Sequence, residues 1–94
     1  MLFDWDHNKN RSNIKKHKVS FELATTVFDD PLHLSIIDQE ATGEMRWITV
    51  GQAANLITLV VVHAYQEIYG EELIRVISAR RATKMEKRQY EEGI

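Results

Sequence analysis

The first third of the chain predicts a short strand followed by two helices of different character. Residues 2–6 (LFDWD) alternate apolar and polar positions, which favours an opening strand. Residues 8–18 (NKNRSNIKKHK) contain one clear apolar residue, Ile14, so a helix here must turn most of its surface to water or to a partner. Asp6 or Asn8 is the candidate N-cap of that helix.

Apolar residues at helical spacing predict a second helix in residues 20–31 (SFELATTVFDDP), with Ser20 as its cap. Pro31 ends it, because proline has no N–H to donate and clashes with the preceding turn.

The pattern then changes to strand periodicity. Three or four antiparallel strands are expected, with candidates at residues 33–38, 44–51, 55–65 and 73–80. Residues 55–65 (NLITLVVVHAY) are apolar on both faces, which predicts the central strand. In residues 44–51 the alternation puts Arg46 midway along its strand, on one face with Glu44 and Ile48.

Turns and a last helix complete the predicted fold. Residues 38–44 (DQEATGE) form the expected turn before the second of these strands. The acidic segment 66–72 is expected as a long hairpin connection, with Gly70 free to adopt a positive φ. Thr83 and Glu86 form a T-x-x-E capping box, which predicts a helix at the C-terminal end. This order indicates one α+β domain over residues 1–94, a small antiparallel sheet with N-terminal helices and a C-terminal helix.

Composition narrows the class of protein. The chain has no cysteine, which excludes disulfides, thiolate nucleophiles and Cys-based zinc sites. Its longest apolar run is too short to cross a bilayer, and no secretory leader is visible, so we expect a cytoplasmic protein.

Charge is distributed unevenly, although the net charge is only −2. Residues 7–18 hold five Lys or Arg and no acid, and residues 75–90 hold six against the single Glu86. Residues 19–74 hold nine acids and one base, Arg46. A basic face forms if the two basic segments meet in space; otherwise they are two solvated helices.

The four histidines do not have metal-ligand spacing, so we predict no metal or other cofactor. His17 ends the basic helix, where the helix dipole favours its protonated form. The simplest interpretation is that its charge compensates the negative end of the helix dipole. His63 ends the central apolar run, and its simplest interpretation is a histidine at the edge of the hydrophobic core.

Arginines offer the remaining candidate chemistry, because guanidinium is a planar cation that matches phosphate. Arg46, with either or both of Arg80 and Arg81, could surround a scissile RNA phosphate opposite Lys16 and His17. The competing interpretation is ordinary ion pairing with Glu44, Glu86 or Glu91.

These segments together resemble the BrnT family, toxins of type II toxin–antitoxin modules with a RelE-like ribonuclease fold. The resemblance rests on FDWDHNKNRSNIKKHKVSFELATTVFDDP near the start, then EMRWITVG and VVVHAY, and finally RVISARRATKMEKRQYEE. It implies a metal-independent ribonuclease in which the ribose 2′-OH attacks the neighbouring phosphate. It also implies a BrnA-type antitoxin as partner, and promoter DNA bound only through the toxin–antitoxin complex.

Matched residue by residue, the resemblance assigns catalysis to Arg46, Arg80 and His17. It assigns RNA binding to Lys16, Arg81, His63 and Tyr90, although Tyr90 also fits a packing role. Two features run against this expectation, the acidic hairpin and the low net charge. The alternatives are a catalytically weak homologue that only binds its antitoxin and, with little support because no helix-turn-helix is visible, a DNA-binding regulator.

Overall fold

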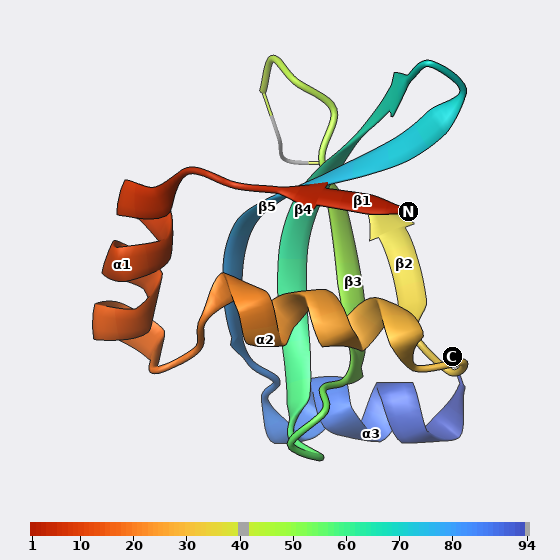
Figure 1. The fold of residues 1–94 in the computed structure, drawn as a ribbon. Helices are drawn as coiled ribbons and strands as arrows, with labels where there is room; N and C mark the ends of the chain where they lie inside the picture. Colours follow the sequence, from red (N-terminus) through yellow and green to blue (C-terminus); the bar gives the residue numbers. More distant parts are fainter. Residues whose placement is uncertain (40–41, 94) are drawn as a thin grey trace.

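A mixed five-stranded sheet organises residues 1–39 and 42–93, the part of the chain that the computed structural model describes (Figure 1). The strand order is β1-β5-β4-β3-β2, so β4 is central, as its apolar sequence predicts. The strands are β1 (Leu2–Asp4), β2 (Leu34–Ile37), β3 (Trp47–Gln52), β4 (Thr58–Ile68) and β5 (Glu71–Arg81). Neighbours are antiparallel except β1 and β5, which are parallel.

The helices begin where the cap residues predict. Helix α1 (His7–His17) is capped by Asp6, whose carboxylate accepts hydrogen bonds from two backbone N–H groups. Helix α2 (Phe21–Thr25) starts after Ser20 and continues as the 3-10 helix η1 (Thr26–Asp29). Helix α3 (Lys84–Glu92) starts with both hydrogen bonds of the capping box.

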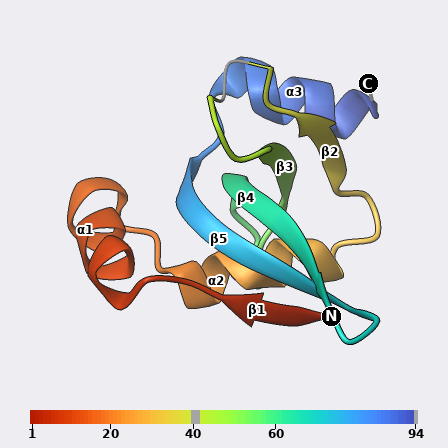
Figure 2. The same ribbon diagram turned by 90° about the horizontal axis from the view of Figure 1, so that it is seen from above.

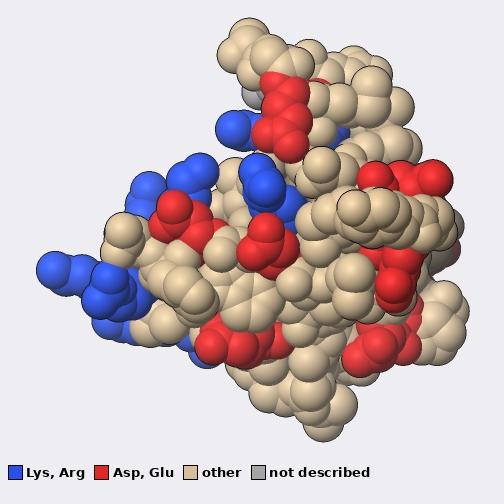
Figure 3. All heavy atoms as spheres, turned by 45° about the horizontal axis from the view of Figure 1, so that its top comes forward, with Lys and Arg blue, Asp and Glu red and all other residues tan. Residues whose placement is uncertain are grey.

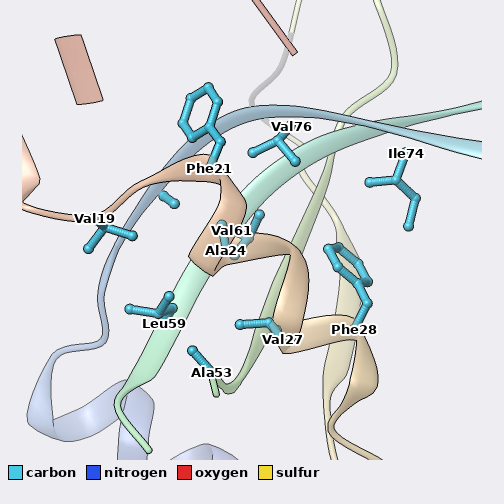
Figure 4. Close-up of a cluster of buried hydrophobic side chains, with 11 residues drawn as sticks. Val19, Phe21, Ala24, Val27, Phe28, Ala53, Leu59, Val61, Ile74 and Val76 are labelled. Atoms are coloured by element: carbon cyan, nitrogen blue, oxygen red, sulfur yellow. The ribbon is translucent and has the colours of Figure 1, made fainter. Parts of the chain in front are cut away.

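The two faces of the sheet are covered unequally. Helices α2 and α3 lie on opposite sides of the sheet, and α1 lies beyond the edge formed by β5 (Figure 2). The hydrophobic core is on the α2 face, where Phe21 and Val27 pack on Leu59 and Val61 with all four side chains fully buried (Figure 4). Burying such side chains is worth about 1.5–3 kcal/mol each. No residue of α3 is buried, so polar contacts must hold much of that helix.

The α+β class and the order of elements are confirmed, with three corrections. The sheet is mixed, because β1 runs parallel to β5. The predicted strand 44–51 begins only at Trp47, so Arg46 precedes β3 and does not lie midway along it. The predicted long connection 66–72 is a two-residue turn, Tyr69 and Gly70, both with positive φ, between strands that extend through its acidic residues.

Part of the predicted turn at 38–44 lies outside the described residues. In the part of the chain that is described, no helix is long and apolar enough to cross a membrane.

Candidate functional site

Helix α1 is attached to the fold through two buried asparagines. Its one large apolar residue, Ile14, is 40% exposed, whereas Asn10 and Asn13 are buried. The Asn10 side chain accepts from the backbone N–H of Phe21 and donates to Glu22. These bonds replace an apolar docking face, so the lysines and arginine of α1 remain at the surface.

Asn13 completes the free edge of β5. Because β1 pairs only with residues 73–75, the backbone of Ala79 has no strand beside it on that edge. The Asn13 side chain donates to the carbonyl of Ala79 at 2.9 Å and accepts from its N–H at 3.1 Å. It also donates to the carbonyl of Val19 at 2.8 Å. One carboxamide thus acts as a peptide group would and fixes α1 against β5.

A groove of about 350 Å³ runs between α1 and β5. Helix α1 lines it with Lys9, Ser12, Lys16 and His17, among others, and β5 lines it with Ile77 and Ser78. Lys and Arg side chains gather on the side of the molecule where α1 lies, while most Asp and Glu lie elsewhere on the same face (Figure 3). The groove therefore presents cations, a histidine and two hydroxyls to an anionic ligand.

A β-bulge shapes the floor of this groove. Val62 pairs with Ser78 and His63 pairs with Val76, so the residue between them, Ile77, has no partner on β4. The extra residue bends the strand locally and directs Ile77 out of the regular ladder. Bulges are common beside functional sites for this reason.

Arg80 is bound to Glu86 of α3. Its two terminal nitrogens donate to the two carboxylate oxygens at 2.8 and 2.9 Å. The hydrogen bonds with Arg80 lower the pKa of Glu86 to about 2, and the same bonds raise the pKa of Arg80. The Arg80 side chain remains 42% exposed, so it can meet a second anion without leaving the first.

Arg81 and Arg46 do not share Arg80's position. Arg81 is exposed at the end of β5. Arg80 pairs with Val60 of β4, which in turn pairs with Val50 of β3. Val50 is four residues after Arg46 in the sequence. At about 3.4 Å per residue and 4.8 Å per strand, the backbones of Arg46 and Arg80 are roughly 17 Å apart. The structure thus brings Lys16 and His17 beside β5 but leaves Arg46 distant.

Tyr90 anchors α3 through its hydroxyl. The hydroxyl donates to Asp30 at 2.5 Å, and this bond raises the pKa of Tyr90 to about 12. Burial acts to raise the pKa of Asp30, but hydrogen bonds from the Gln52 N–H, Tyr90 and the Leu32 N–H outweigh it and leave the pKa low. The Tyr90 hydroxyl is thus engaged in a contact between α3 and the residue after η1, and the assignment of Tyr90 to RNA binding stays a prediction.

His63 is fully buried and cannot touch RNA in this conformation, which corrects its assignment to RNA binding. Its Nε2 is 2.6 Å from the Thr49 hydroxyl, which is 2.7 Å from that of Ser35. The rings of Phe28 and Tyr65 pack edge-on against it, each at 4.9 Å. Burial, with a smaller effect of His33, lowers the pKa of His63 to about 4. The residue is a neutral core histidine, as the plain interpretation held.

Sequence reasoning missed Lys9, Ser12 and Asn13. The available signal was the i, i+3, i+4, i+7 spacing of Lys9, Ser12, Asn13 and Lys16, which puts them on neighbouring rows of one helix. Within residues 1–39 and 42–93, no group of three His, Asp or Glu side chains could hold a metal ion.

Comparisons with known proteins agree with this fold. Residues 5–86 match the family model described as "Ribonuclease toxin, BrnT, of type II toxin-antitoxin system". The 1.1 Å crystal structure of the ribonuclease toxin BrnT of Brucella abortus aligns with a TM-score of 0.59 over 89% of this chain and 100% of that chain. At 23% identity this likeness shows the fold alone. No curated protein matches the sequence.

Proposed function

Because the chain belongs to the BrnT family of ribonuclease toxins of type II toxin–antitoxin systems, we propose that it is an endoribonuclease that works without a metal ion. The observation that carries this proposal is the groove between α1 and β5, where Lys16, His17 and Ser78 come together. A cationic groove beside a strand carrying an arginine suits a polyanion whose cleavage builds negative charge on phosphate.

Lys16 and Lys9 would bind the RNA backbone. Both are exposed on α1, and both line the groove. Phosphate contacts of this kind contribute affinity that is independent of sequence and falls as salt rises. Arg81, exposed at the end of the same strand, would add a further backbone contact.

Arg80 would stabilise the phosphate during reaction. It follows Ala79, the residue that Asn13 binds, and it is two positions beyond Ser78 on the same face of β5. Glu86 would hold the guanidinium in one orientation, since a bidentate pair fixes a planar fork. We assign Arg46 no part at the same phosphate, because the strand register keeps it distant.

His17 is the proposed proton-transfer group. It is half-buried in the groove wall, and histidine is the side chain that most often transfers protons in enzymes. In the reaction it would take the proton from the ribose 2′-OH while O2′ bonds to phosphorus. The P–O5′ bond then breaks, and the leaving O5′ takes a proton from water while His17 returns its own proton to the solvent, giving a 2′,3′-cyclic phosphate and a 5′-hydroxyl.

The partner in the cell would be an antitoxin of the BrnA type. The family is defined as the toxin of a type II system, in which a protein antitoxin neutralises the toxin. We further propose that promoter DNA is bound only by the complex, with the antitoxin supplying the DNA-binding part.

The experiment is RNA cleavage by purified protein in excess EDTA, with wild type beside Lys16→Gln, His17→Gln and Arg80→Ala. We expect wild type to release fragments with cyclic phosphate ends. The three variants should be folded and slower, and Lys16→Gln should also show a weaker dependence on salt. Cleavage that EDTA abolishes would exclude the metal-free route, and equal rates in all variants would exclude this groove as the site.

A second candidate function is a binding-only homologue that engages its antitoxin without cleaving RNA. The observation that favours it is the bidentate pair of Arg80 and Glu86, in which the charge of the arginine is already balanced within the protein. This function predicts no cleavage by folded wild type, together with tight binding of the antitoxin encoded beside it.

A further inference from the structure

A second pocket adjoins the groove between α1 and β5. It has a volume of about 320 Å³ and lies where β1, the start of α1 and β5 meet. Lys9 and Ile77 line both spaces, so they form the wall between them. A chain lying along the groove would thus place one of its neighbouring units in this pocket.

The pocket presents an acceptor and a donor side by side. Asp4 and Arg75 are directly paired across the parallel strands β1 and β5. Their nearest charged atoms are 3.9 Å apart, beyond hydrogen-bonding distance, and their side chains are 54% and 51% exposed. The Asp4 carboxylate accepts from the backbone N–H of Trp5 at 2.8 Å, and its remaining lone pairs and the guanidinium keep hydrogen-bonding capacity for a ligand.

Trp5, which also lines the pocket, carries an unpaired donor. Its indole Nε1 is buried and has no hydrogen-bond partner among the described residues. Buried N–H groups are seldom left without an acceptor, so this one marks a place where an acceptor is expected. The nitrogen itself is covered, so a ligand in the pocket contacts the exposed part of the Trp5 ring.

Resting on the proposed function, we infer that this pocket is a subsite for a guanine base of the bound RNA. Phosphate fits poorly, because the carboxylates of Asp4 and Asp6 offset the cations of Lys9 and Arg75, so the pocket has no excess of positive charge for an anion. Guanine offers two adjacent donors, N1–H and the N2 amino group, to the carboxylate of Asp4. It also offers two adjacent acceptors, O6 and N7, which arginine binds in bidentate fashion.

The other RNA bases match less well. Adenine lacks the O6 acceptor and the N1–H donor, and cytosine and uracil lack N7. None of them meets both side chains with two hydrogen bonds each. Arg75 and Asp4 would thus determine which nucleotide lies beside the cleaved phosphate.

The two tryptophans of the chain allow a direct test by nuclear magnetic resonance. Trp5 lies in the pocket, whereas Trp47 packs on Tyr65 and does not line it. The indole N–H signals are followed while the 5′-monophosphates of guanosine, adenosine, cytidine and uridine, and inorganic phosphate, are added separately. Wild type is compared with Arg75→Gln and Asp4→Asn, with the unmoved Trp47 signal as the check on folding.

We expect guanosine monophosphate to shift the Trp5 signal and leave Trp47 in place. The other nucleotides should bind about tenfold more weakly or worse, as should guanosine monophosphate with either variant. Equal responses to all four nucleotides, a response to phosphate alone, or unchanged binding by Arg75→Gln would overturn the inference. RNA cleavage by the same wild-type preparation separates the two proposals. Cleavage without a Trp5 response rejects only the guanine subsite, and a Trp5 response without cleavage rejects only the nuclease.

Discussion

Arg80, at the end of β5, and Glu86, in the first turn of α3, form a bidentate pair, with both guanidinium–carboxylate distances below 3 Å. One oxygen of Glu86 also accepts from the backbone N–H of Thr83, which closes the capping box. The strand end, the turn and the helix start are thus connected through one carboxylate, and a cation proposed to act on phosphate is held by the helix that follows it.

Replacing Glu86 with Gln separates the structural role of this pair from the catalytic one. Glutamine keeps the capping hydrogen bond but removes the charge opposite Arg80. We expect the stability to fall by about 1–2 kcal/mol, a value reduced for the partial exposure of the pair. Cleavage should persist at a lower rate, because Arg80 is still present but less firmly oriented, whereas Arg80→Ala should lower kcat/KM about 10²–10³-fold. Urea unfolding and single-substrate cleavage kinetics measure the two effects.

The comparison with Arg80→Ala decides the outcome. If folded Glu86→Gln loses as much activity as Arg80→Ala, the arginine acts only while fixed by its partner. If neither variant changes cleavage, Arg80 is a structural residue alone.

Asn13→Leu tests whether one carboxamide holds α1 on the sheet. Leucine has the same branched shape but no polar atom, so it leaves the Ala79 N–H and carbonyl without this partner. We expect a loss of about 2–4 kcal/mol, because buried backbone groups lose their hydrogen bonds. The matched control is Asn8→Ala, an exposed residue of the same helix, which should stay within about 0.5 kcal/mol of wild type. If Asn13→Leu and wild type are equally stable in urea unfolding, α1 docks by other contacts.

The sequence predicted the helix starts well, because capping is local. Asp6, Ser20 and the Thr83–Glu86 box each act within one turn of their own helix. The docking of α1 was harder to foresee, because apolar periodicity indicates Ile14 while the helix is fixed by Asn10 and Asn13. Their partners Phe21 and Ala79 are set by tertiary structure, up to 66 residues away.

The candidate site was only partly predictable. Lys16 and His17 are near neighbours in one helix, so their joint position follows from local structure. The distance between Arg46 and Arg80 depends on the register of three strands, which alternation alone does not give. The burial of His63 depends on Phe28, which η1 brings over the sheet.

His63 predicts that the protein loses stability in weak acid. Its folded pKa of about 4 is below the ordinary 6.5, so the unfolded chain binds the proton more readily. The contribution of neutral His63 to the free energy of unfolding is intact above pH 6.5. It is lost as the pH falls toward 4, by about 1.4 kcal/mol per pH unit. His63→Phe, which keeps the ring packing, should remove this part of the pH dependence, and exposed His7→Gln should not. Unfolding free energies in urea from pH 7.5 to 4.5 test it, and identical slopes in wild type and His63→Phe would contradict it.

Tyr90 predicts a complementary loss of stability in alkali. Its hydrogen bond to Asp30 raises the pKa of Tyr90 from 10.0 to about 12, so the folded state keeps a proton that the unfolded chain releases. The contribution of the Tyr90 hydrogen bond to the free energy of unfolding is complete below pH 10 and is lost as the pH rises toward 12. Tyr90→Phe should therefore be less stable than wild type at neutral pH, and the difference should shrink above pH 10. The matched control is Tyr69→Phe, since the ring of Tyr69 is fully exposed in the β4–β5 turn. Urea unfolding at pH 7 and at several values above 10 gives the comparison, and a difference that stays constant with pH would show that the Tyr90 hydroxyl does not anchor α3.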